Sequence, residues 1–285
     1  MDFMLESGAS QIRRANPQWQ KLQRRSPKLF RAFELFGDFQ NQLMHHLPHA
    51  WRSLAVAPSA DASEMDVLLV QDTTDEQLTI DWAVLVGDIV HNARSALDHA
   101  AWQLVGLNGG TPGTHTQFPT ARASKDFDTK TRLRGAHPYV HETVRALEPW
   151  GGGAGHWLWV LTQLDNVDKH RLLLDVNSSS NSNVSIQDPE TGEWRDQWIS
   201  TEGRQAGDVV RTAPRGTMKV RQSSATMYFE HHDGDAWDGN APQGYKINAQ
   251  LVLEFCLTAA GDAHDAMGRA DNRRRRDGEA RADTP

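Results

Sequence analysis

The stretch HNARSALDHAAWQL (91–104) carries two histidines, an arginine and an aspartate among alanines and leucines. Side chains of these types, at this spacing, suit a catalytic site, a metal site, or only the hydrated face of a helix. Arg94 and His99 are the candidates for chemistry, because arginine stays charged and histidine titrates near neutral pH. Neighbouring polar residues are candidate supporting groups: His91, Asn92, Ser95 and Asp98.

The periodicity around this stretch predicts a long helix over 80–107. At about 100° per residue, the apolar residues fall on one arc and the polar ones on the other. A hydrated face is usually rich in Glu and Lys, and over 86–105 this face has neither. Its His, Asn, Ser and Trp residues suit directed hydrogen bonds, which indicates specific partners. An ordinary amphipathic surface helix is the alternative interpretation.

A second polar cluster, DNVDKHR (165–171), lies in a predicted helix over 157–174. Asp165 and Asp168 are three residues apart and share a face with Leu161 and Leu164. Because an unpaired buried carboxylate is costly, these aspartates need partners, and Arg94 and His99 are natural ones.

Two basic residues that follow the aspartates, His170 and Arg171, are further supporting candidates, and Arg171 is able to pair with Asp168 inside its own helix. A buried ion-pair network that holds two helices in register is the structural alternative to a catalytic site.

A metal site is a weaker interpretation of the same residues. Asp88 and His91 are one turn apart, and the 165–170 cluster could complete a ligand shell. Di-iron helical bundles, however, use Glu-x-x-His pairs with further glutamates opposite, and aspartate has a shorter reach. The chain has no His-Glu-x-x-His and no Cys-x-x-Cys motif. We therefore expect no metal and no other cofactor.

Element patterns divide the chain into four parts. An extension over 1–25 precedes a helical domain over 26–176, which also holds short strands at 51–56 and 66–71. A β-rich region with a closing helix follows over 177–268, and it is either a separate unit or packed as one unit with the helical domain. The tail over 269–285, with its RRRR run, lacks an apolar face and is expected to be disordered. The predicted fold class is α+β.

Composition narrows the possible partners and the compartment. A formal charge of −7 gives no bulk electrostatic reason to coat nucleic acid or an anionic membrane, although a local basic groove remains possible. No apolar run is long enough to span a bilayer, and no signal peptide is evident. The single cysteine, Cys256, excludes an internal disulfide, so a cytoplasmic location is expected.

Two motifs, GDIVHNARSALDHAAWQLV and LDNVDKHRLL, together resemble an uncharacterised family of bacterial proteins over roughly 80–175. That resemblance brings no activity with it. Arg94 followed after four residues by His99 also resembles the Arg-x(4–6)-His motif of HEPN domains, the helical nucleotide-binding and ribonuclease domains of prokaryotic toxin and defence systems.

The HEPN resemblance implies a metal-independent endoribonuclease whose site forms at a homodimer interface, here through the helix of Arg94 and His99. Arg94 would neutralise the scissile phosphate, and His99 would act as general acid or base. The chain departs from the family at Ser95, where Asn, Asp or His is common, and in its strand-rich second half. The alternative is a non-catalytic binding or regulatory protein, in which Arg94, His99, Asp165 and Asp168 form an interhelical network.

Overall fold

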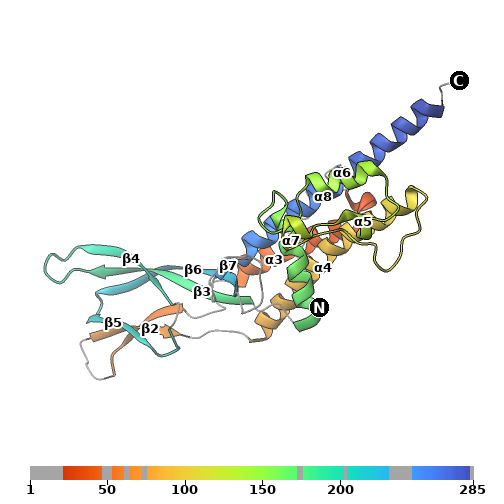
Figure 1. The fold of residues 1–285 in the computed structure, drawn as a ribbon. Coiled ribbons are helices and arrows are strands. Elements are labelled where there is room, and N and C mark those ends of the chain that lie inside the picture. Colours follow the sequence, from red (N-terminus) through yellow and green to blue (C-terminus); the bar gives the residue numbers. More distant parts are fainter. Residues whose placement is uncertain are drawn as a thin grey trace.

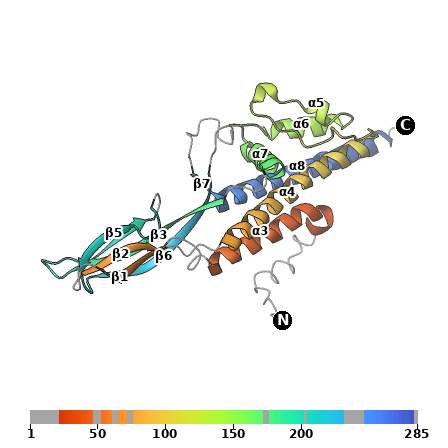
Figure 2. The ribbon, with the colours of Figure 1, turned by 90° about the horizontal axis from the view of Figure 1, so that it is seen from below.

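The computed structural model describes residues 22–46, 53–60, 65–71, 76–171, 176–201, 204–230 and 246–282. It divides into a helical body and a β arm that extends away from one end of the body (Figures 1 and 2). The helical body consists of α3 (Pro27–His46), α4 (Glu76–Leu107), η1 (Ser124–Asp126), α5 (Thr129–Arg132), α6 (Pro138–Ala146), α7 (His156–Arg171) and α8 (Ala249–Ala282). The β arm consists of β1 (Ser53–Pro58), β2 (Met65–Gln71), β3 (Val176–Gln187), β4 (Trp194–Ser200), β5 (Val209–Pro214), β6 (Met218–Glu230) and β7 (Lys246–Asn248).

Helix α4 is the centre of the helical body and packs against α3, α7 and α8. Its predicted apolar arc is buried, including Ile89, Ala93 and Leu97, none of which is exposed at all. Small residues on this arc allow neighbouring helices to approach closely, and the resulting apolar core runs through all the long helices. Part of the polar arc of α4, including Arg94 and Asp98, faces α7 and the segment 108–137, which places the candidate site there.

Two antiparallel sheets build the β arm, with strand orders β1-β2-β5 and β4-β3-β6-β7. They share a small apolar core in which Leu68 and Val184 are fully buried. Sheet residues alternate between faces, so this core occupies only the facing surfaces of the two sheets. The other face of the four-stranded sheet is left uncovered by the first sheet.

The α+β fold class predicted from the sequence is confirmed, but the domain boundaries are drawn differently. The sheet order places β1 and β2, from the predicted helical domain, beside β5 from the predicted β-rich region. The Ser- and Asn-rich boundary at 177–183 lies inside β3 and is paired with β6. Serine and asparagine there follow strand geometry because β6 pairs with the whole stretch and β4 pairs with residues 181–183 on the other side.

The expectation of a disordered tail is wrong for residues 269–282, which continue α8. The tail is held where the Tyr139 hydroxyl donates to Asp277 and the guanidinium of Arg273 lies 4.0 Å from the centroid of the Tyr139 ring. Residues 1–21 of the predicted extension and 283–285 lie outside the described residues. No helix in the described part of the chain is both long and apolar enough to cross a membrane.

Candidate functional site

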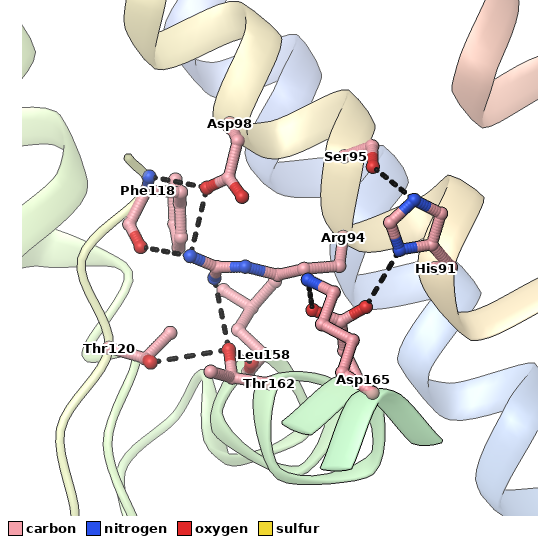
Figure 3. Close-up of polar contacts among 10 residues, drawn as sticks. His91, Arg94, Ser95, Asp98, Phe118, Thr120, Leu158, Thr162 and Asp165 are labelled. Carbon is pink, nitrogen blue, oxygen red and sulfur yellow. Dashed lines mark hydrogen bonds and ion pairs between the residues drawn. The ribbon is translucent and has the colours of Figure 1, made fainter. Parts of the chain in front are cut away.

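Arg94 is the central residue of the site and is almost fully buried between α4, α7 and the 108–137 segment (Figure 3). Its guanidinium donates to three acceptors: Asp98 Oδ1 at 2.8 Å, the Phe118 carbonyl oxygen at 2.7 Å and Thr162 Oγ1 at 2.9 Å. Burial lowers the pKa of Arg94, and the nearby carboxylates of Asp98 and Asp165 oppose that change. Arginine nevertheless remains charged, so the site holds a buried cation with its partners in place.

The main chain of Phe118 is clamped from both sides by the Arg94–Asp98 pair. Its carbonyl accepts from Arg94 Nη2, while its N–H donates to Asp98 Oδ1 at 2.8 Å. Asp98 is four residues after Arg94, so the two side chains reach the same point from one face of α4. The pair therefore supplies hydrogen-bond partners to a buried segment of irregular backbone. Without them, the polar groups of that segment would be costly to bury.

The Thr162 hydroxyl links this cluster to α7. Because Arg94 can only donate, Thr162 Oγ1 accepts from it and gives its own hydrogen to the Leu158 carbonyl at 3.0 Å. Thr120 Oγ1 then donates to Thr162 Oγ1 at 3.2 Å. This chain of hydrogen bonds joins α4, α7 and the 108–137 segment into one polar joint.

Asp165 on α7 is buried and pairs with two cations or potential cations. Its Oδ1 lies 3.1 Å from His91 Nδ1, and its Oδ2 lies 2.5 Å from Lys169 Nζ. His91 is half-exposed, and its Nε2 lies 3.4 Å from Ser95 Oγ (Figure 3). The predicted partnership between α4 and α7 thus exists, but it joins Asp165 to His91 rather than to His99.

The order Ser95–His91–Asp165 matches the order of groups in a serine hydrolase triad. Acyl transfer also needs donors aimed at the developing oxyanion, and these are usually backbone N–H groups. Ser95 lies in the middle of α4, where backbone N–H groups bond to carbonyls within the helix. The backbone of α4 around Ser95 therefore supplies no oxyanion donors, and the three residues form a hydrogen-bonded joint between α4 and α7.

Asp168 lies against α4 where α4 has a glycine. A Cβ atom built on Gly87 would lie 2.3 Å from Asp168 Oδ1, so only glycine permits this approach without a shift. Desolvation raises the pKa of Asp168, and the negative charge of Asp165 raises it further. The surroundings of Asp168 thus disfavour its charged form, whereas the Asp165 carboxylate contacts His91 and Lys169.

His99 is exposed and lies apart from Arg94. Five residues along a helix rotate a side chain by about 140°, so His99 points away from the buried joint. Asn92 also turns from the site and donates to the Asp88 carbonyl at 2.7 Å. His170 and Arg171 end α7, and their side chains lie outside the described residues. The structure brings together Arg94, Asp98 and the residues of α7, but not Arg94 and His99.

A pocket of about 540 Å³ opens between α4, α7 and the 108–137 segment. Polar and charged side chains dominate its wall: Arg94, Asp98, Gln117, Thr120, Arg122, Arg132, Thr162, Gln163, Asp165, Asn166 and Lys169. Arg94 and Lys169 are paired with Asp98 and Asp165 in that wall. Arg122 and Arg132 are exposed, and neither forms an ion pair with a carboxylate of the described residues. The pocket therefore carries an excess of two positive charges.

The contribution of the 108–137 segment could not be predicted from sequence patterns. Arg122 and Arg132 face the pocket from it, and Gln117, with its amide oxygen oriented toward Arg132, accepts from Arg132 Nη1 at 2.8 Å. Thr162 on α7 was missed as well. A Gly-, Pro- and Thr-rich segment gives no periodicity from which to read which residues face inward. The one available signal was its length, which is typical of functional loops.

Within the described residues, no group of three or more His, Cys, Asp and Glu side chains could hold a metal ion. Comparison with protein-family models, with curated proteins and with solved structures gives no match. The site must therefore be interpreted from its own geometry.

Proposed function

We propose that this protein binds a small anion, a phosphate ester or a carboxylate, in the pocket between α4 and α7, as a binding or regulatory protein rather than a catalyst. The proposal is based on which charged side chains of the pocket wall form ion pairs and which do not. Two cations are held by Asp98 and Asp165, while Arg122 and Arg132 add uncompensated positive charge. An anionic ligand would neutralise that excess.

The buried joint supports a role in building the pocket rather than in chemistry. Arg94 already donates to three acceptors, so its capacity to grip a phosphate is largely used. Arg132 is oriented by Gln117, and arginine forms bidentate hydrogen bonds with planar or tetrahedral anions. The exposed arginines thus provide recognition, and the buried one provides the rigid wall behind them.

Isothermal calorimetry with inorganic phosphate, adenosine monophosphate and citrate tests this proposal. We expect at least one probe to bind and Arg122→Ala/Arg132→Ala to weaken binding at least tenfold. Arg134→Ala is the matched control, because Arg134 is exposed on the same segment but does not line the pocket. No binding of any probe, or equal loss with Arg134→Ala, would contradict the proposal.

A HEPN-like endoribonuclease of a bacterial toxin or defence system, acting in the cytoplasm, is the second candidate. The cationic pocket suits a phosphodiester, and His99 is exposed on α4 near Trp102, which is 48 % exposed. Within one chain His99 is turned away from the pocket. This function therefore requires a homodimer through α4, in which the second copy supplies its histidine.

Incubation with RNA in the presence of a chelator tests the second candidate. We expect a nuclease to cleave without metal and to lose activity in His99→Ala, whose exposed side chain can be removed without unfolding. If wild-type protein leaves RNA intact, or if His99→Ala cleaves equally well, this candidate is wrong. Binding of the small anions would be unaffected by either outcome.

A further inference from the structure

We infer that the uncovered face of the four-stranded sheet binds single-stranded nucleic acid by stacking bases on tryptophan. This face, here called the tryptophan face, comprises Trp194, Asp196 and Trp198 of β4, Ser185 of β3, and Lys219 and Arg221 of β6. Trp198 is 58 % exposed and Trp194 is 38 % exposed, which is unusual for such large aromatic rings in strands.

Strand pairing places these residues on one side of the sheet. Lys219 is paired with Ser185, and Ser185 with Asp196, so the three share a face. Trp194 and Trp198 are each two residues from Asp196 on β4 and therefore point to the same side. Ile199 follows Trp198 on β4, so its side chain points to the opposite side of the sheet and packs into the core of the β arm.

The two tryptophans are four residues apart on β4, or about 13 Å along the strand. A stacked strand rises about 3.4 Å per nucleotide, so the rings would hold two bases that are not immediate neighbours. Strand β4 is at the open edge of its sheet, which gives a nucleotide chain access from the side. A sheet face with spaced aromatic rings is a stacking platform tolerant of sequence.

Positive charge accompanies the aromatic rings. The ammonium group of Lys219 lies 4.6 Å from the centroid of the Trp194 ring, and Arg221 Nε donates to Ser185 Oγ at 2.8 Å. Both cations are exposed, and Asp196, which accepts from Ser185 Oγ, is the carboxylate among them. The face thus combines stacking surfaces with cations for the phosphates, although the chain as a whole is acidic.

This combination favours nucleic acid over an oligosaccharide. Sugars also stack on tryptophan, but they are neutral and gain nothing from Lys219 and Arg221. A phosphate backbone gains from both, and its binding must then weaken with added salt. The inference is independent of the pocket between α4 and α7, because the tryptophan face is on the β arm (Figure 1).

Fluorescence anisotropy with a labelled 12-nucleotide oligo(U) RNA and the matching oligo(dT) DNA tests the inference on the full chain. We expect binding that falls as salt is raised from 50 to about 200 mM. Trp198→Ala should weaken it about tenfold, which is within the range for the loss of one base–aromatic stack. Lys219→Ala should weaken it less and reduce its dependence on salt.

Trp102→Ala is the matched control, since Trp102 is a comparably exposed tryptophan on the helical body. It should leave oligonucleotide binding unchanged. Circular dichroism establishes that each variant is folded. The inference is overturned if neither oligonucleotide binds, if Trp102→Ala weakens binding as much as Trp198→Ala, or if a neutral oligosaccharide competes as well as unlabelled oligo(U).

Discussion

The helical body and the β arm use charged and aromatic residues in opposite ways. In the body, Arg94 and Asp165 are buried and almost every polar atom near them has a partner within the protein. In the arm, Trp198 and Lys219 are exposed on the face of the four-stranded sheet that points away from the three-stranded sheet. Groups that are satisfied internally hold a structure together, whereas groups left exposed at a cost in solubility point to a partner.

The sizes of the two cores give the same contrast. The body has one large core through all its long helices, and among the residues whose burial is described the arm has six buried apolar residues between its two sheets. A small core contributes little free energy, so the arm also relies on its strand pairing. We expect a substitution in the core of one region to destabilise that region and to leave the other largely unchanged.

The largest effect is expected from Arg94→Ala in the body. Removing the cation leaves the Phe118 carbonyl buried without its donor and the partly buried Asp98 carboxylate without its counter-ion, at a cost of roughly 3–5 kcal/mol of unfolding free energy. Urea unfolding followed by circular dichroism measures this loss. Arg134→Ala, at an exposed position, should change the stability by no more than about 0.5 kcal/mol. Equal stability of the two variants would mean that the joint around Arg94 is not structural.

The second effect is expected in the arm, from Leu68→Ala. Leu68 is fully buried in the small core, and such truncations cost about 2–5 kcal/mol. Because the cores are separate, hydrogen exchange should accelerate in β2, β3 and β5 while α4 and α7 keep their protection. Equal acceleration in the helices would show that body and arm unfold as a single unit.

Much of the fold could be predicted from the sequence because periodicity reports burial directly. The predicted helix over 80–107 agrees with α4, and its apolar arc is the buried one. The tail was mispredicted because its local pattern has no apolar face. It is held by burial of Ala270 in the core of the body and by polar and cation–π contacts with Tyr139, which is over a hundred residues away in the chain.

The candidate site was predictable only in part. The joining of α4 and α7 followed from the cost of burying Asp165, and that pairing exists. The partner was mistaken: His91, and not His99, reaches Asp165, because His99 is turned by about 140° from Arg94 on the helix. The clamp on Phe118 uses backbone atoms, which any residue type supplies, so no sequence pattern could reveal it.

A third, smaller effect is expected from Gly87→Ala. Alanine usually favours a helix by about 0.5–1 kcal/mol over glycine, but here its Cβ would meet the Asp168 carboxylate at 2.3 Å. We expect a net loss of about 1 kcal/mol, because the carboxylate must shift within a packed interface. Gly106→Ala in the same helix is the control: its nearest atom, Pro112 Cγ at 3.7 Å, allows the methyl group, and stability should rise. Thermal unfolding of both variants distinguishes crowding from helix propensity.

The smallest effect, and the one with the opposite sign, is expected from Asp168→Asn. The pKa of Asp168 is raised above its ordinary value of 3.8 by desolvation and by Asp165, so the folded protein binds its proton more tightly than the unfolded chain. Stability from this group is therefore greatest at low pH and falls as pH rises through 3.8 and then through the folded-state pKa. At pH 7 the amide removes that penalty, but Asp168 is partly exposed and water screens its charge, so we expect a gain of no more than about 0.5–1 kcal/mol. The gain should vanish near pH 3, where the wild-type carboxyl is already neutral. A gain that persists at pH 3 would mean that it comes from the shape of the amide and not from removal of the charge of Asp168.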